Sequence, residues 1–156
     1  MLTFHLPDET FAREGVVFQF DIGERSWVVN FSPGFSRYTA LHIVGSTAYV
    51  IVDGNGHRFH IDRPREYEIL QPGVITDSRL LDDPVMVVLA GVVDLSAYTE
   101  EGMVWRTAPL SIDGLKLQAC DGRVITGVAE RTAEGDSRYF SVHPATGKAT
   151  AERRYP

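Results

Sequence analysis

Cysteine is nearly absent from this 156-residue chain, whose single cysteine is Cys120. A single cysteine cannot form an intrachain disulfide or supply a cysteine-rich zinc site, and its rarity is typical of a reducing compartment. We therefore expect Cys120 to be a small buried apolar residue rather than a reactive thiol.

Long hydrophobic runs are also absent. The longest apolar stretch, PVMVVLAGVVDL from Pro84 to Leu95, is too short to span a bilayer. The first fifteen residues, MLTFHLPDETFAREG, have neither the basic segment nor the apolar segment of a secretory signal. These absences predict a cytoplasmic protein with no membrane partner.

Positive charge is in the minority, with 15 Lys and Arg against 21 Asp and Glu and a formal net charge of −6. Nucleic-acid binding needs a basic surface that neutralises phosphates, and no Lys/Arg-rich run is present. We therefore expect no nucleic-acid partner. An acidic surface instead favours association with a basic protein.

What the sequence does contain is apolar alternation with a period of two. The stretch VVFQFDI places Val16, Phe18, Phe20 and Ile22 on one face and Val17, Gln19 and Asp21 on the other. The same pattern, bounded by Gly, Asp, Asn or Pro, recurs at 26–31, 37–44, 47–54, 57–62, 66–70, 74–80, 115–119, 123–130 and 138–143. It predicts an all-β fold of antiparallel meanders that form a sandwich or a barrel.

Two neighbouring stretches depart from this alternation. The apolar run from Val85 to Val93 predicts a central strand that is covered on both faces. The following stretch DLSAYTEEG is the one helix candidate, since Asp94 or Ser96 could cap a short helix that ends before Gly102. We therefore expect at most one short helix, near 94–101.

The chain also shows an internal echo within what we interpret as a single domain, 1–156. The segments 27–62 and 105–143 each begin with a tryptophan, Trp27 and Trp105. Each then passes a glycine-containing turn and continues as a meander, so that Leu41 aligns with Leu117. The echo indicates either a duplication or the general likeness of any two β-meanders.

The second copy carries a resemblance to a known family. LSIDGLKLQACDGRVITGVAE, followed by RYFSVHPATGK, resembles a single blade of a β-propeller, especially the quinoprotein type. In that family a D-x-x-T-G turn follows the closing strand, and here HPATG from His143 to Gly147 has histidine in place of the acid. The ending is also similar to small uncharacterised bacterial all-β proteins. The resemblance implies a four-stranded meander in the last third of the chain. A propeller needs at least about four blades of about forty residues, and this chain is too short to supply them, so the resemblance implies no activity.

The stretch DGNGHRFHID, residues 53–62, is the most polar of the predicted strands and carries two histidines. We interpret Asn55-Gly56 as its tight turn. A regular strand sends His57 and His60 to opposite faces, so we expect no metal and no cofactor there. Arg58, His60 and Asp62 share one face, which is either a small binding site or ordinary cross-strand pairing on a solvated surface.

Catalytic signatures are weak. HRFHIDRPREYEILQPG resembles in part the metal motif of cupins, but HxxH replaces their chelating HxH pair. Ser46 in VGSTA lacks the second glycine of a nucleophile elbow. His42 lies on an apolar strand face, so we expect a hydrogen-bonded core histidine rather than a base. The sequence leaves enzyme status open and favours a protein that is not an enzyme.

Two classes of function remain. The first is a protein-binding module, such as an immunity-type inhibitor of a toxin, whose partner would be basic. Its expected contact residues are two acidic pairs, which we predict at opposite ends of the strand 85–93: Asp82, Asp83, Glu100 and Glu101.

The second class is a small-molecule-binding barrel or sandwich, with weak enzymatic activity as one possibility. Its pocket would use Arg58 and His60 together with Trp27 or Trp105. A binding protein should show an acidic patch, whereas a small-molecule site should show an apolar cavity.

Overall fold

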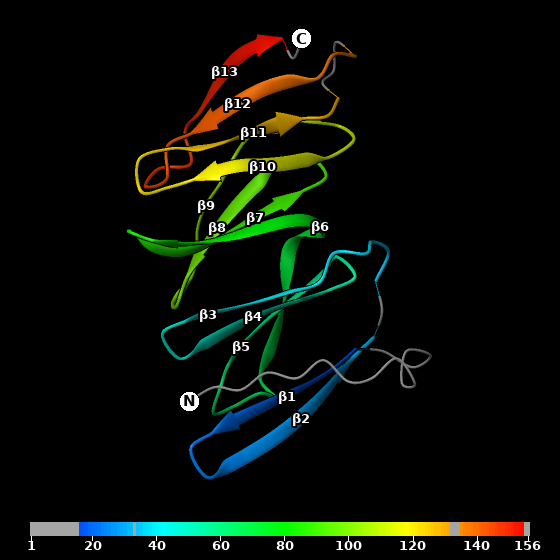
Figure 1. The fold of residues 1–156 in the computed structure, drawn as a ribbon, viewed down its shortest axis with the longest axis vertical. Helices are drawn as coiled ribbons and strands as arrows, with labels where there is room; N and C mark the ends of the chain where they lie inside the picture. Colours follow the sequence, from blue (N-terminus) through cyan, green and yellow to red (C-terminus); the bar gives the residue numbers. More distant parts are fainter. Residues whose placement is uncertain (1–15, 33, 132–134, 155–156) are drawn as a thin grey trace.

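A computed structural model describes residues 16–32, 34–131 and 135–154, and in these residues every regular element is a strand (Figure 1). The all-β prediction is confirmed. No helix that could cross a membrane occurs in the described part of the chain. The prediction about a leader concerns residues 1–15, which lie outside it. The strands are β1 (Val16–Ile22), β2 (Arg25–Phe31), β3 (Ala40–Val44), β4 (Thr47–Val52), β5 (Asn55–His60), β6 (Tyr67–Asp82), β7 (Val85–Gly91), β8 (Leu95–Thr99), β9 (Gly102–Arg106), β10 (Leu115–Cys120), β11 (Ile125–Ala129), β12 (Arg138–Val142) and β13 (Ala149–Arg154).

The strands form a β1–β2 hairpin, a sheet of β3 to β9 and a sheet of β10 to β13, each in sequence order. All pairings are antiparallel, as short turns between consecutive strands require. None of the sheets in the described residues closes on itself. The four-stranded meander that the propeller resemblance implied is present as β10–β13.

The long strand β6 belongs to two meanders. Its first part pairs with β5 and its second part with β7. Between them the register jumps from His57↔Ile69 to Asn55↔Val74, and Gly73 has a φ of +94°. Such an irregularity bends a strand, so the stretches predicted as two strands, 66–70 and 74–80, are two parts of one. The sheet therefore divides into the meanders β3–β6 and β6–β9.

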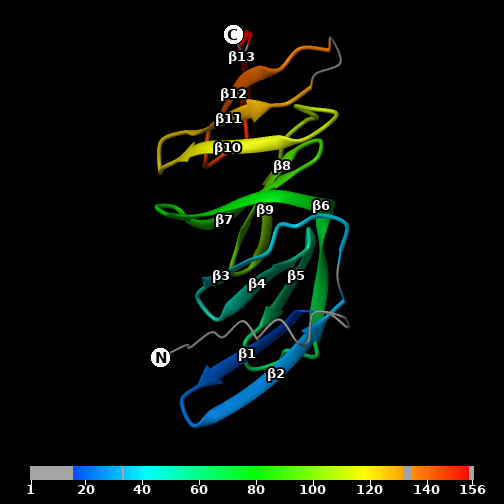
Figure 2. The same ribbon diagram turned by 45° about the vertical axis from the view of Figure 1, so that its right-hand side comes forward.

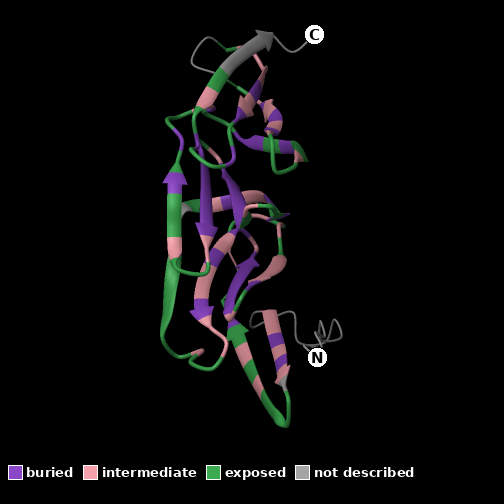
Figure 3. Cartoon of the chain, turned by 90° about the vertical axis from the view of Figure 1, so that its left-hand side faces the viewer, coloured by how far each residue is buried: buried purple, intermediate pink, exposed green. Residues whose placement is uncertain are grey.

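The hairpin and the three meanders are stacked as successive layers along the longest axis of the molecule, with β1 and β13 near opposite ends (Figures 1 and 2). A separate apolar cluster fills each of the three interfaces. The cluster between the hairpin and β3–β6 contains Phe18, Phe20, Val50 and Phe59. Figure 3 shows the buried residues following the strands through the middle of the stack.

The strand β7, in the middle of the stack, has no polar face because a layer lies on each side of it. In β7, Met86 and Val88 face the β10–β13 layer, whereas Val87 and Leu89 face the β3–β6 layer. The unbroken apolar run from Val85 thus reflects burial on both sides, and the predicted central strand is confirmed.

The predicted helix near 94–101 is wrong, since this stretch forms β8. Asp94 does not cap a helix: its carboxylate is buried and accepts a 2.9 Å hydrogen bond from Nε of Arg106 on the neighbouring strand. Leu95 and Ala97 face one cluster and Tyr98 faces another. Burial on two opposite faces suits a strand, and a helix would bury only one stripe of this segment.

The predicted turn of the β4–β5 hairpin is displaced by two residues. Val52 pairs with Asn55, so the turn consists of Asp53 and Gly54, both with positive φ. Asn55 and Gly56 are already part of β5. The same hairpin chemistry applies, because Asp-Gly favours this turn as strongly as Asn-Gly.

The two segments of the internal echo occupy similar positions in their layers. Leu41 lies in β3 and Leu117 in β10, each the first strand of a four-stranded meander. Whether the two arose by duplication stays a prediction.

Candidate functional site

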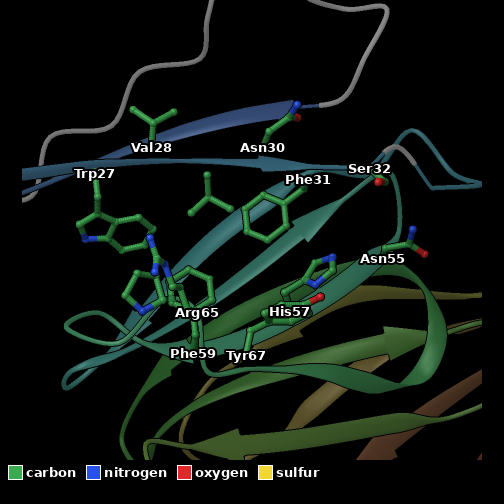
Figure 4. Close-up of a pocket in the computed structure, with 12 residues that line it drawn as sticks. Trp27, Val28, Asn30, Phe31, Ser32, Asn55, His57, Phe59, Arg65 and Tyr67 are labelled. Atoms are coloured by element: carbon green, nitrogen blue, oxygen red, sulfur yellow. The ribbon is translucent and has the colours of Figure 1, made fainter.

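One hollow, with a volume of about 610 Å³, lies between the β1–β2 hairpin and β5 (Figure 4). We call it the aromatic pocket. Its walls come from β2, β5 and the segment that leads into β6: Trp27, Val28, Val29, Asn30, Phe31, Ser32, Asn55, His57, Phe59, Pro64, Arg65 and Tyr67.

The pocket follows from the period of the two strands that form it. Trp27, Val29 and Phe31 alternate along β2 with residues that point away, and His57 and Phe59 do the same on β5. The rings meet across the gap, with centroid distances of 5.6 Å from Trp27 to Phe59 and 4.7 Å from Phe31 to His57. The result is an aromatic wall that is bordered by the polar side chains of Asn30, Ser32 and Asn55.

Three polar atoms in this wall lack partners. Both ring nitrogens of His57 and Nε1 of Trp27 are buried and form no hydrogen bond with a described residue. Burial lowers the pKa of His57, so its imidazole is neutral near pH 7. Buried donors and acceptors without partners are uncommon in folded proteins.

The pocket also has an unbalanced charge. Arg65 lines it and forms no ion pair within the described residues, whereas its neighbour Arg63 pairs with Glu66 at 3.0 Å. None of the described residues that line it is an Asp or a Glu. Among the described residues, the pocket therefore combines aromatic walls and neutral polar groups with one uncompensated cation.

The other face of β5 borders a second hollow, of about 520 Å³, which we call the charged groove. Arg58 is its central residue and is fully engaged. It donates to the hydroxyl of Tyr49 at 3.1 Å, to the carboxylate of Glu68 at 3.0 Å and to the carbonyl of Glu100 at 2.6 Å. Arg58 thus links β4, β6 and the β8–β9 turn, which is a structural role.

The two histidines of the sequence motif lie on opposite faces of β5, as predicted. His57 lines the aromatic pocket and His60 lines the charged groove with Arg58. Asp62, predicted on the same face, follows the end of β5 and stays beside His60: its backbone N–H donates to Nδ1 of His60 at 3.2 Å, while its carboxylate pairs with Arg25 at 2.8 Å. No group of three or more His, Cys, Asp or Glu in the described residues could hold a metal ion.

The two acidic pairs lie at the same end of the β6–β9 meander, so the prediction of opposite ends is wrong. Asp82 and Asp83 close β6, and Glu100 and Glu101 follow β8. Because β7 and β8 are antiparallel with Val87 opposite Tyr98, the end of β8 lies beside the start of β7. The prediction treated the stretch after β7 as a helix and so missed this reversal.

Glu100 differs from the other three acids. Its Oε1 accepts a 2.6 Å hydrogen bond from the backbone N–H of Ser46, and a side chain at Gly45 would collide with its carboxylate. Glu100 therefore holds the β3–β4 turn against the β8–β9 turn. Asp82, Asp83 and Glu101 are exposed and form no ion pair within the described residues.

A further acid joins this end from the next layer. The β10–β11 turn packs on the β6–β7 turn, where Gly122 leaves room for the carbonyl of Asp83. The neighbouring carboxylate of Asp121 accepts hydrogen bonds from the backbone N–H groups of Val124 and Arg123, which lower its pKa. We define the acidic end as Asp82, Asp83, Glu101 and Asp121.

A buried polar cluster escaped the sequence analysis in part. His42 contacts the hydroxyl of Ser78 through Nε2 at 2.6 Å, and Tyr38 contacts the same hydroxyl at 2.8 Å. The prediction that His42 is hydrogen-bonded is confirmed, but the residue is half-buried and belongs to none of the apolar core clusters of the described residues. Ser78 is only 2% exposed, so its hydroxyl is closed to a substrate. Nothing in the sequence pointed to this pairing over 36 positions.

Cys120 is partly buried against the cluster between β6–β9 and β10–β13. Burial raises the pKa of its thiol to about 11. The thiol is therefore protonated at neutral pH and a poor nucleophile.

No protein-family model matches the sequence, and no curated protein matches it. The fold is similar to a crystal structure of the N-terminal domain of Nup159, with a TM-score of 0.44 and 10% identity. The match covers 89% of this chain and 41% of that one. A likeness at this level carries no argument about function.

Proposed function

We propose that this protein binds another protein, and that the acidic end is its contact surface. The observation that carries the proposal is the gathering of exposed carboxylates from separate turns, none with an ion pair to another described residue: Asp82 and Asp83, and Glu101. Figure 1 supports it by placing the β6–β7 and β10–β11 turns on the same side of the stack.

The chemistry of this end favours a basic partner. Like charges in neighbouring turns repel one another, and a cationic surface relieves that repulsion while steering the encounter. Exposed apolar side chains stand beside the acids, with Val85 54% exposed and Met103 56% exposed. Apolar contacts with a charged surround are the usual composition of a protein interface. An immunity-type inhibitor of a basic toxin fits this description.

The experiment uses the full chain as bait to isolate a partner, and then measures association rate and affinity against salt. We expect Asp82→Lys with Asp83→Lys to lower the association rate about tenfold or more at low salt, and Glu101→Lys to act in the same direction. Glu100 is left unchanged because it supports the β3–β4 turn.

A matched control reverses two acids at the far end of the β10–β11 hairpin, Asp113→Lys with Glu130→Lys. Each pairs with an exposed cation, so their reversal costs little stability. The control should bind the partner like the wild type. If neither reversal at the acidic end alters rate or affinity, or if the control weakens binding equally, the acidic end is not the contact surface.

The small-molecule function remains a second candidate because of one observation, the aromatic pocket. Trp27, one of the residues proposed for such a pocket, lines it, whereas Arg58 and His60 lie in the charged groove. Trp105 is buried elsewhere, with its N–H donated to the carbonyl of Pro144.

A further inference from the structure

We propose that the aromatic pocket binds a planar aromatic carboxylate of one or two rings, with its carboxylate at Arg65 and its ring against Phe31 and Phe59. The pocket lies on β2 and β5, whereas the acidic end lies on the turns after β6, β8 and β10. The two proposals are therefore independent.

The walls select for a flat apolar ring. Phe31 and Phe59 lie with ring planes only 20° apart and centroids 6.4 Å apart, and Trp27 meets Phe59 nearly edge-on. Aromatic rings pack against such surfaces in offset or edge-to-face arrangements. A volume of about 610 Å³ accommodates a small ring system together with its substituent.

The charge of the pocket selects for an anion. An aromatic cage for an ammonium group would carry an acid to balance it, and no acid is present among the described residues that line this pocket. Within the same residues Arg65 is the only Lys or Arg of the walls, and it has no carboxylate partner in the described part of the chain. A guanidinium matches a carboxylate in two parallel hydrogen bonds, which gives both affinity and orientation.

The far end of the pocket offers neutral polar groups. Figure 4 shows Arg65 beside Trp27 and Phe59, with His57 farther along between Phe31 and Tyr67. The imidazole of His57 has no hydrogen-bond partner among the residues that the structure describes, and Tyr67, which covers its edge at a centroid distance of 5.8 Å, is 57% exposed. Rotation of Tyr67 opens the imidazole to a hydroxyl or ring nitrogen on the distal side of the ligand.

The experiment titrates the full chain with 1-naphthylacetate and with its neutral isostere 1-naphthylacetamide, using calorimetry and tryptophan fluorescence. We expect the acid to bind about tenfold or more tightly than the amide. Arg65→Gln should remove that difference by weakening the acid and leaving the amide unchanged. Arg63→Gln is the matched control: it lies two positions away on the same loop, is paired with Glu66 and borders the charged groove, so it should change neither affinity.

Histidine side-chain ¹⁵N shifts locate the ligand without any substitution. Addition of 1-naphthylacetate should move the resonances of His57 and leave those of His60, on the opposite face of β5, in place. Equal affinity for acid and amide, equal losses in the two arginine variants, movement of His60 instead of His57, or no binding at millimolar ligand would each overturn the proposal.

Discussion

At the scale of single residues, Trp105 shows how one side chain joins two layers. It comes from β9, is 8% exposed, and donates its indole N–H to the carbonyl of Pro144 in the β12–β13 turn at 2.5 Å. Gly147 of the same turn lies on the face of the indole and has a φ of +66°. A Cβ at this position would stand 2.7 Å from the ring.

Gly147→Ala should therefore destabilise the protein by about 2–4 kcal/mol, from left-handed backbone strain together with a clash against Trp105. Gly23→Ala is the matched control. Its φ is similar, +60°, but a Cβ there meets nothing within 4 Å, so about 1 kcal/mol is expected. The free energy of unfolding in urea measures both. Equal losses would show that the indole yields to the added methyl group.

The same turn, HPATG, has a histidine where the blade motif that the sequence resembles has an acid. Nδ1 of His143 accepts a hydrogen bond from the backbone N–H of Ala145 at 3.3 Å, an acceptor role that a carboxylate also performs. The sequence likeness correctly indicated a turn here, and the substituted residue keeps its local chemistry.

At the scale of elements, the strands that the sequence predicted well are those whose burial leaves a clear pattern. Alternation identified β1 and β2, and an unbroken apolar run identified β7, because each pattern follows directly from how many faces are covered. β8 was mistaken for a helix because Asp94 and Ser96 resemble caps, whereas Asp94 in fact pairs with Arg106 on β9. An aspartate that caps a helix and an aspartate that pairs with a neighbouring strand look alike in the sequence. Only the residue that it contacts in the folded protein distinguishes the two roles.

The candidate sites depended on contacts between elements, and were therefore predicted less well. The shared face of Arg58 and His60 follows from the period of a single strand. The common end of the acidic pairs depends on the reversal at β8, and the aromatic pocket depends on the hairpin packing over β5. Trp27 and His57 are 30 positions apart, and no local pattern pairs them.

His42 of β3, which contacts the hydroxyl of Ser78 on β6, makes the free energy of unfolding depend on pH. Burial and the neighbouring charge of Arg79 lower the pKa of His42, and burial also lowers the pKa of His57. The unfolded chain therefore takes up protons more readily than the folded protein below about pH 6.5. We expect the free energy of unfolding to fall as the pH is lowered through this window, and His42→Gln to reduce the slope while still reaching Ser78.

The matched comparison for this prediction is Asp121→Asn. The pKa of Asp121 is lowered by its backbone hydrogen bonds, so its contribution is lost only when the pH falls below about 4. Urea unfolding at a series of pH values separates the two windows. A slope between pH 7 and 5 that His42→Gln leaves unchanged would assign the proton uptake to other groups.

At the scale of the whole molecule, the protein is an open stack in which each layer is held by its own apolar cluster. The β1–β2 hairpin forms no strand pairing with another sheet in the described residues, so side-chain packing attaches it. Phe20 is central to that packing. It is fully buried, stacks on Trp27 at 4.2 Å and meets Phe59 at 5.7 Å.

Phe20→Ala should consequently release the hairpin before the rest of the stack unfolds. Removing a buried phenylalanine costs about 3–5 kcal/mol, and here the whole loss falls on one interface. With Trp105→Phe as background, the emission of Trp27 should shift at a lower urea concentration than the far-ultraviolet circular dichroism. With Trp27→Phe as background, the emission of Trp105 should follow the circular dichroism.

Phe140→Ala, in the cluster around Trp105, is the control and should shift the main transition instead. If both tryptophans in Phe20→Ala instead report the same transition, the layers unfold as one cooperative unit. The apolar clusters would then be coupled to one another through β4 and β7 more strongly than the hairpin is held to β5.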